Sequence, residues 1–92
     1  MIRVLYYAGI RELVGTSETR VDEFSGTLAG LLRHLEERHG VSPVDYSEAQ
    51  DADPLSVLII MINGRHIAHV GGLDALISDG DVVTIFPLVG GG

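Results

Sequence analysis

The sequence predicts an α+β fold in which one main helix packs on one face of a mixed sheet of four to five strands. One segment alone repeats its leucines with a helical period, and several short apolar runs are separated by glycine-containing turns. The 92 residues, of which 46% are hydrophobic, supply one core but not two. We therefore expect a single domain over residues 1–86 and a flexible glycine tail over residues 87–92.

The first quarter of the chain predicts a hairpin. The β-prone run from Ile2 to Tyr7 predicts a first strand, and the segment from Ala8 to Val14 predicts a short helical turn that Gly15 closes. A second strand is expected near Glu18 to Phe24. Because the link between them is short, the two strands should pair antiparallel.

The main helix is expected from Thr27 to His39, with Gly40 as its stop. Its apolar side repeats at i, i+3, i+4 and i+7, which is typical of a helix with one buried face. This side consists of Leu28, Leu31, Leu32 and Leu35. The segment from Val41 to Pro54 has two prolines, several acidic residues and little periodicity, and it predicts an irregular surface loop.

The second half of the chain predicts another hairpin and a final strand. An apolar run from Val57 to Ile62, an Asn63-Gly64 turn and a returning strand from Arg65 to Val70 form the hairpin. A loop with a helical turn is expected over residues 71–77, and the last strand runs from Val82 to Phe86. The predicted order is ββαββ followed by a terminal strand.

One main helix cannot cover both faces of such a sheet, so one face should stay open. The run from Val57 to Ile62 is apolar throughout, and the last strand is apolar on both sides, which together predict an apolar docking patch on the open face. Two alternatives remain. The loop from Val41 to Pro54 could cover this face, or neighbouring strands could simply bury these residues.

Charge and composition exclude several functions. The formal net charge of −7 argues against binding to phosphate backbones, so no nucleic-acid partner is expected. The chain has no Cys, and all six basic residues are Arg, which excludes thiolate chemistry and leaves no Lys side chain to acylate. It has neither the apolar length of a membrane span nor a signal-peptide start. We therefore expect no membrane partner and a cytoplasmic protein.

The histidine spacing predicts no metal site. His66 and His69 are three residues apart, which on one strand places them on opposite faces. His34 and His39 lie near the end of the main helix, where partial positive charge suits the helix dipole and nothing more is required. No metal and no intrinsically bound cofactor are expected.

The segment after the last strand, from Pro87 to Gly92, ends in three glycines. Glycine has no Cβ, so such a tail could thread a narrow channel in a partner enzyme and present its carboxylate there. Six extended residues reach roughly 20 Å. The alternative is a frayed chain end or an engineered remnant, because chain ends are often disordered.

These segments together resemble the ubiquitin-like β-grasp sulfur carriers of the molybdopterin synthase small-subunit and thiamine sulfur carrier type. The resemblance covers nearly the whole chain. The segments from Ile2 to Ala8 and from Arg11 to Gly15 look like the first strand and turn of the molybdopterin synthase small subunit. The Asn63-Gly64 turn and the segment from Asp79 to Pro87 look like its last two strands, which precede a terminal Gly-Gly.

Two features depart from the family pattern. The family usually closes with Pro-Pro, two variable residues and Gly-Gly, whereas here Leu88 replaces the second proline and Gly90 adds a third glycine. The loop from Val41 to Pro54 and residues 71–73 look more like carriers for cysteine synthesis and archaeal carriers that also modify proteins. These departures bear on the pathway more than on the chemistry.

The resemblance implies a ubiquitin-like β-grasp fold and a chemical role for the tail. An E1-like enzyme would use ATP to adenylate the carboxylate of Gly92, and a sulfur donor would displace AMP to leave a thiocarboxylate. Gly90 and Gly91 would form the slender approach through the enzyme's channel. ATP is thus used by the activating partner, and the chain itself binds no cofactor.

The resemblance also implies docking residues. Tyr7 and Phe86 match apolar positions that the family uses against its partners, His66 falls near another such position, and Pro87 and Leu88 begin the tail. Ordinary sheet packing is the alternative for Tyr7, Phe86 and His66. The implied partners are the E1-like adenylating enzyme and the large catalytic subunit of molybdopterin synthase, or another sulfur acceptor enzyme.

Several functions remain open at this point. The resemblance favours a sulfur carrier for molybdopterin (molybdenum or tungsten cofactor) biosynthesis, because the first third of the chain matches that subunit best. The alternatives are a carrier for cysteine or thiamine synthesis, a ubiquitin-like modifier conjugated to lysines, and an interaction module with an inert tail. The chain alone catalyses nothing and would act only as the sulfur-donating subunit of a heteromeric synthase.

Overall fold

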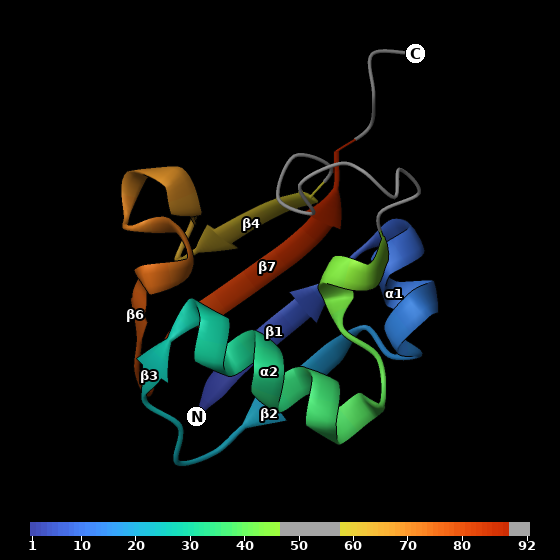
Figure 1. Ribbon diagram of the computed structural model, residues 1–92, viewed down its shortest axis with the longest axis horizontal. Coiled ribbons are helices and arrows are strands. Elements are labelled where there is room, and N and C mark those ends of the chain that lie inside the picture. The colour runs from blue at the N-terminus through green and yellow to red at the C-terminus, as the bar shows by residue number, and fades with distance from the viewer. Residues whose placement is uncertain (47–57, 89–92) are drawn as a thin grey trace.

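The protein was studied as a computed structural model that describes residues 1–46 and 58–88. The chain begins with β1 (Ile2–Tyr6), α1 (Ala8–Val14) and β2 (Glu18–Val21), and β1 and β2 pair antiparallel as predicted (Figure 1). Gly15 ends α1 with a φ of 92°. β2 is shorter than expected, because it ends at Val21 rather than Phe24.

The main helix is α2 (Leu28–His39), which begins one residue later than predicted and ends at the predicted residue. The Thr27 hydroxyl caps the first turn by accepting a hydrogen bond from the Gly30 N–H at 3.1 Å. At the other end, Gly40 adopts a left-handed φ of 75°, which a residue with a Cβ reaches only at a cost, and its N–H donates to the Glu36 carbonyl at 2.8 Å. The four predicted leucines form the buried side of α2.

The sheet has five strands in the order β2-β1-β7-β4-β5, with β4 at Leu58–Ile62, β5 at Arg65–His66 and β7 at Val82–Pro87. β1 and β7 are parallel, whereas the other neighbours are antiparallel, so the sheet is mixed as predicted. Asn63 and Gly64 join β4 to β5 with φ angles of 52° and 83°, which is typical of a type I′ hairpin turn.

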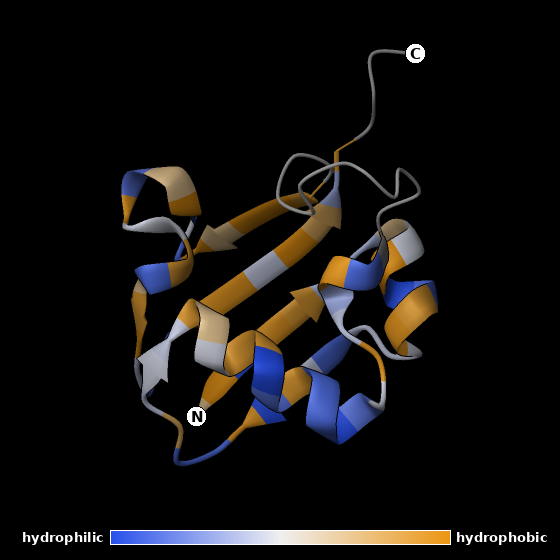
Figure 2. Cartoon of the chain, viewed as in Figure 1, coloured by the Kyte–Doolittle hydropathy of each residue, from blue (hydrophilic) through white to orange (hydrophobic). Residues whose placement is uncertain are grey.

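α2 lies across one face of the sheet, and the core fills the space between them (Figure 1). Alternate residues of each central strand are buried there, and full burial of such side chains contributes about 1.5–3 kcal/mol each. Figure 2 shows hydrophobic residues along β1, β4 and β7 and hydrophilic ones on the outer side of α2. The residues of β1, β4 and β7 that face this core are Ile2, Val4, Tyr6, Leu58, Ile60, Ile62, Val83 and Ile85.

The returning strand predicted from Arg65 to Val70 is wrong beyond His66. There the chain turns into two short 3₁₀ helices, η3 (Ile67–His69) and η4 (Gly72–Asp74). Ile67 stays buried in the core within this turn, and Val70 packs against the core from its end. A second sheet was also missed: β3 (Gly26–Thr27) pairs with β6 (Leu76–Ile77), and strands this short have no recognisable period.

Part of the predicted surface loop is structured. The 3₁₀ helix η1 (Pro43–Tyr46) contacts α1 and α2, and both Ser42 and Pro43 are buried. Because α2 lies on the covered side of the sheet, this part of the loop does not cover the open face. Residues 47–57, which include Val57 of the predicted strand, lie outside the described residues.

Candidate functional site

Tyr7 and Phe86 lie beside each other at the end of the sheet where β7 ends. Parallel pairing places Tyr6 opposite Ile85, and the Tyr7 N–H donates to the Ile85 carbonyl at 3.1 Å. The backbone is still extended at Tyr7, with φ −128° and ψ 154°, so its side chain points away from the buried Tyr6. The Tyr7 and Phe86 rings meet edge to face with their centroids 6.4 Å apart. The fold therefore brings together two predicted docking residues from opposite ends of the sequence.

Further apolar side chains continue this surface across the sheet. Ile59 lies directly opposite Phe86, and Met61 and Leu5 lie on either side of Thr84. Side chains directly opposite each other share one face of a sheet. The residues that alternate with them along β1 and β4 are buried against α2, so this set faces the other way. We name it the open-face patch: Leu5, Tyr7, Ile59, Met61 and Phe86.

The open-face patch is accessible where it meets the end of β7. Tyr7 is 48% exposed, and an open cavity of about 370 Å³ is lined by Tyr7, Thr84 and Phe86. Leu88, which follows β7, is 52% exposed. Large apolar side chains grouped at the surface are typical of protein contact sites. The arrangement suits the docking of a partner immediately beside the tail.

The remaining predicted site residues fall into three groups. His66 lies opposite Met61 and therefore on the open face, at its β5 edge. Pro87 lies opposite Leu58 in the last pairing of β7, where proline has no N–H to donate and the ladder can end. Gly90, Gly91 and Gly92 lie outside the described residues.

The expectation that His66 and His69 lie on opposite faces is wrong, because the strand ends at His66. His69 lies in η3, where residues three apart eclipse, and the two imidazole rings are 6.3 Å apart. His66 Nδ1 accepts a hydrogen bond from the Ala68 N–H at 3.0 Å, which caps η3. Within residues 1–46 and 58–88, no group of three or more ligating side chains could hold a metal ion.

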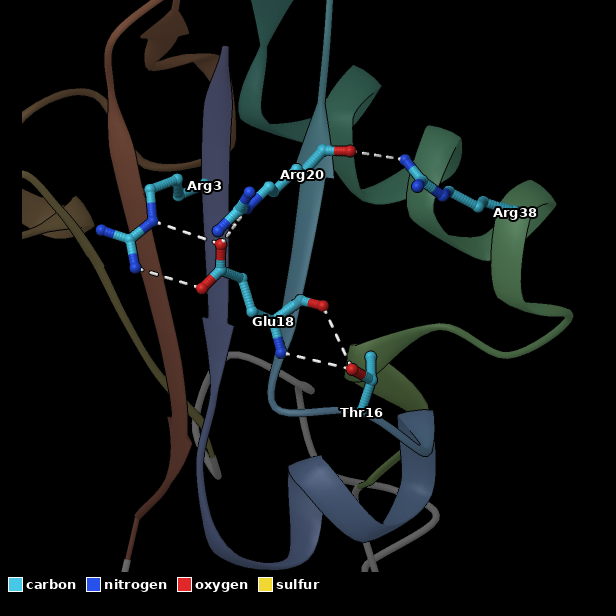
Figure 3. Close-up of polar contacts among 5 residues, drawn as sticks. All are labelled: Arg3, Thr16, Glu18, Arg20 and Arg38. Carbon is cyan, nitrogen blue, oxygen red and sulfur yellow. Dashed lines mark hydrogen bonds and ion pairs between the residues drawn. The ribbon is translucent and has the colours of Figure 1, made fainter.

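Beyond Leu5, the open face becomes charged (Figure 3). The Glu18 carboxylate accepts hydrogen bonds from Arg3 Nε at 3.3 Å, Arg3 Nη2 at 3.1 Å and Arg20 Nε at 2.7 Å. These hydrogen bonds lower the pKa of Glu18 to about 2, and the contribution of Arg3 is the largest. Sequence reasoning missed this group because Arg3 and Arg20 become neighbours only through the β1–β2 register. The alternation of Arg3, Leu5 and Tyr7 was the available signal for their shared face.

Comparison with known proteins identifies the family of this chain. The sequence profile of the ThiS family matches residues 4–92. The chain belongs to the ThiS family. The suspected relationship to ubiquitin-like sulfur carriers is thereby confirmed, and the family includes both sulfur carriers and ubiquitin-like modifiers.

Two curated relatives of this ThiS family chain span its length. Small archaeal modifier protein 3 from Haloferax volcanii is 31% identical over 99% of this chain and 98% of its own. The molybdopterin synthase sulfur carrier subunit from Escherichia coli is 32% identical over 100% of both chains. The coarse function, a sulfur carrier or ubiquitin-like modifier, follows from these relationships. The pathway in which each relative acts is a property of that relative.

A solved structure confirms the fold of this ThiS family chain. The structure of the Amycolatopsis orientalis BexX/CysO complex contains a chain that matches with a TM-score of 0.78, 22% identity and full coverage of both chains. The predicted ubiquitin-like β-grasp fold, with a mixed five-stranded sheet, is therefore confirmed. Among the helices of the described residues, none is long and apolar enough to cross a membrane.

Proposed function

We propose that this chain is a sulfur carrier that serves as the small subunit of a molybdopterin synthase. The observation that carries the proposal is the relationship to the E. coli sulfur carrier subunit, which extends over the whole of both chains at 32% identity. The glycines at positions 90–92 supply the reactive end, and the open-face patch supplies the docking surface beside it.

The proposed chemistry begins with a carboxylate that is a poor acyl donor, because a terminal carboxyl with a pKa of about 3.5 is ionised at neutral pH. An E1-like enzyme lets the Gly92 carboxylate attack the α-phosphate of ATP, which gives an acyl-adenylate and pyrophosphate. A donor at the oxidation level of sulfide then attacks the acyl carbon, and AMP leaves. The product is a thiocarboxylate, which is tethered and nucleophilic and can pass its sulfur to an acceptor without releasing sulfide.

The chain's own residues position this group in the proposed reaction. Gly90 and Gly91 approach the active site of each partner without a side chain, and Leu88 begins the tail at the rim of the open-face patch. Tyr7 and Phe86 anchor the domain to the E1-like enzyme and then to the large synthase subunit, which uses the sulfur. Because activation consumes ATP, we place the reaction in the cytoplasm.

The first experiment is the intact mass of the protein after incubation with ATP, the E1-like enzyme of its host and sulfide. We expect a gain of about 16 Da, since one carboxylate oxygen is replaced by sulfur. No Arg or Lys follows Arg65, so trypsin releases residues 66–92 as one fragment that should carry the whole gain. A chain lacking Gly91 and Gly92 should keep its fold and show no gain. A full-length chain that stays unmodified, beside an enzyme active on another carrier, would contradict the proposal.

A second function is favoured by the 31% identity to small archaeal modifier protein 3. A modifier shares the adenylation step but ends joined through its terminal glycine to lysines of other proteins. Isopeptide-linked conjugates in host extracts would support this function, and a thiocarboxylate without conjugates would support the carrier. Carriers for cysteine or thiamine synthesis give the same thiocarboxylate and are distinguished by which acceptor enzyme takes its sulfur.

A further inference from the structure

Arg3 and Arg20 form a basic pair on the same face as the open-face patch. Arg3 lies opposite Arg20 on β2, and Leu5, the next residue of this face along β1, belongs to the patch. Arg3 is followed along the same face by Leu5 and Tyr7, and four residues of strand span about 13 Å. A standard protein interface buries about 800 Å² on each partner and is roughly 30 Å across. A partner that covers Tyr7 and Phe86 therefore also reaches the arginines.

The two guanidinium groups are held in place before any partner arrives. Glu18 lies between them, and its carboxylate accepts hydrogen bonds from the Nε of both arginines and from Nη2 of Arg3 (Figure 3). The side chains of Arg3 and Arg20 are 45% and 66% exposed, whereas that of Glu18 is only 23% exposed. Each guanidinium has five N–H groups, so terminal ones remain for an outside acceptor. Holding the arginines in advance reduces the conformational entropy that binding would otherwise cost.

The charge of this group differs in sign from the charge of the whole chain. Two arginines and one carboxylate sum to +1, within a protein of formal net charge −7. The long-range field favours basic partner surfaces, but this position on the docking face is complementary to an acidic side chain. A planar guanidinium pairs with a carboxylate through two parallel hydrogen bonds, which fixes orientation as well as affinity.

We propose that Arg3 and Arg20 receive an Asp or Glu carboxylate of the E1-like activating enzyme and set the orientation in which the open-face patch docks. This proposal rests on the proposed function, since it assigns the chemistry of that partner's surface. Arg3 and Arg20 act in docking and do not contact the reacting carboxylate. Their loss should therefore weaken binding without slowing adenylation once the enzyme is saturated.

The test compares two double variants of equal net charge. Arg3→Gln with Arg20→Gln removes the basic pair, whereas Arg11→Gln with Arg33→Gln removes two exposed arginines of α1 and α2. ATP-dependent pyrophosphate release by the E1-like enzyme is measured against carrier concentration. We expect KM to rise about fivefold to tenfold in the first variant with kcat unchanged, and to change less than about twofold in the second. Added salt should raise the KM of the wild type more than that of the first variant.

Equal KM values in the two double variants would overturn the proposal. Arg3→Lys with Arg20→Lys keeps the charge but loses the planar fork, and we expect an intermediate KM. If the first double variant does not fold, Arg20→Gln alone leaves the pairing of Arg3 with Glu18 intact and is compared with Arg33→Gln. Failure of the proposed function would be seen separately, because the wild type itself would then release no pyrophosphate and form no thiocarboxylate.

Discussion

At the end of α2, the imidazole of His39 belongs to a hydrogen-bonded chain that enters the core. The Tyr6 hydroxyl donates to Thr19 Oγ1 at 2.9 Å, and Thr19 Oγ1 lies 2.8 Å from His39 Nε2. Tyr6 and Thr19 are buried. Loss of hydration, followed by the positive charge of Arg38, lowers the pKa of His39. Sequence reasoning expected only a favourable dipole contact here, because Thr19 lies on another element.

His39 should make stability depend on pH below its ordinary pKa of about 6.5. The folded pKa is lower than the unfolded one, so the unfolded chain binds the proton first and stability falls as the pH drops below about 6.5. The pKa of Glu18 is lowered from 4.5 to about 2 in the folded chain, so its protonation reduces stability only at more acidic pH. Urea denaturation between about pH 5 and about pH 7.5, a range that brackets the ordinary pKa of His, measures the His39 effect. His39→Gln should flatten the slope, and His34→Gln, on the same helix, should not. Equal slopes in both variants would contradict the assignment.

At the scale of the element, β2 is an outer strand whose edge is protected by side chains. The Ser17 carbonyl accepts from the Tyr6 N–H, so the backbone groups of Glu18 and Arg20 point outward. Arg38 Nη1 donates to the Arg20 carbonyl at 2.6 Å, and the Thr16 hydroxyl contacts both the N–H and the carbonyl of Glu18 (Figure 3). Side chains that occupy edge groups keep strands of other molecules from pairing there.

Opening this edge should promote self-association. In Thr16→Val with Arg38→Ala, the outward carbonyls of β2 lose their partners and become available to β2 of a second copy. We expect the average mass measured by sedimentation to rise from that of the wild type as concentration increases, by up to one further chain of 9.8 kDa. Arg33→Ala, also on α2, is the control. A double variant that sediments like the wild type would show that these contacts do not guard the edge.

At the scale of the whole molecule, the open-face patch and the start of the tail share one end of the sheet. β7 supplies both Phe86 and the start of the tail, and β1 brings Tyr7 to the same end by pairing parallel to it. β6 lies on the far side of the molecule from this end of β7 (Figure 1). In the proposed function, a partner bound to the open-face patch would therefore hold the tail close to its own active site, which would reduce the entropy lost when the tail enters.

A charge in the open-face patch should weaken docking while the fold is kept. In Phe86→Asp, a carboxylate would have to be desolvated against the partner, so we expect binding to the E1-like enzyme to fall at least about tenfold. Phe86 is half-buried on the open face, outside the core that α2 covers, so the variant should still fold, as circular dichroism would show. Leu76→Asp, at a residue that is 79% exposed on β6, introduces the same charge away from the patch and should bind normally. Unchanged affinity in a folded Phe86→Asp protein would count against the docking face.

Local features of the sequence determined much of this protein. The leucine spacing of α2 with Gly40 as its stop, the Asn63-Gly64 turn and the central strands depend on neighbours in the chain, and they were predicted correctly. The glycine tail and the segments around it also pointed to the family that the comparisons then confirmed. Such features can be read directly because backbone preference and periodic burial act within a few residues.

Only the tertiary structure decided which residues share the open face of the sheet. Tyr7 meets Phe86, and Arg3 meets Arg20, because strand order and register bring distant segments together. The end of β5 at His66 and the pairing of β3 with β6 were also decided by burial in the assembled core, which overrides the weak preferences of two-residue strands. Contacts between distant segments form only when the whole core closes, so no local pattern in the chain encodes them.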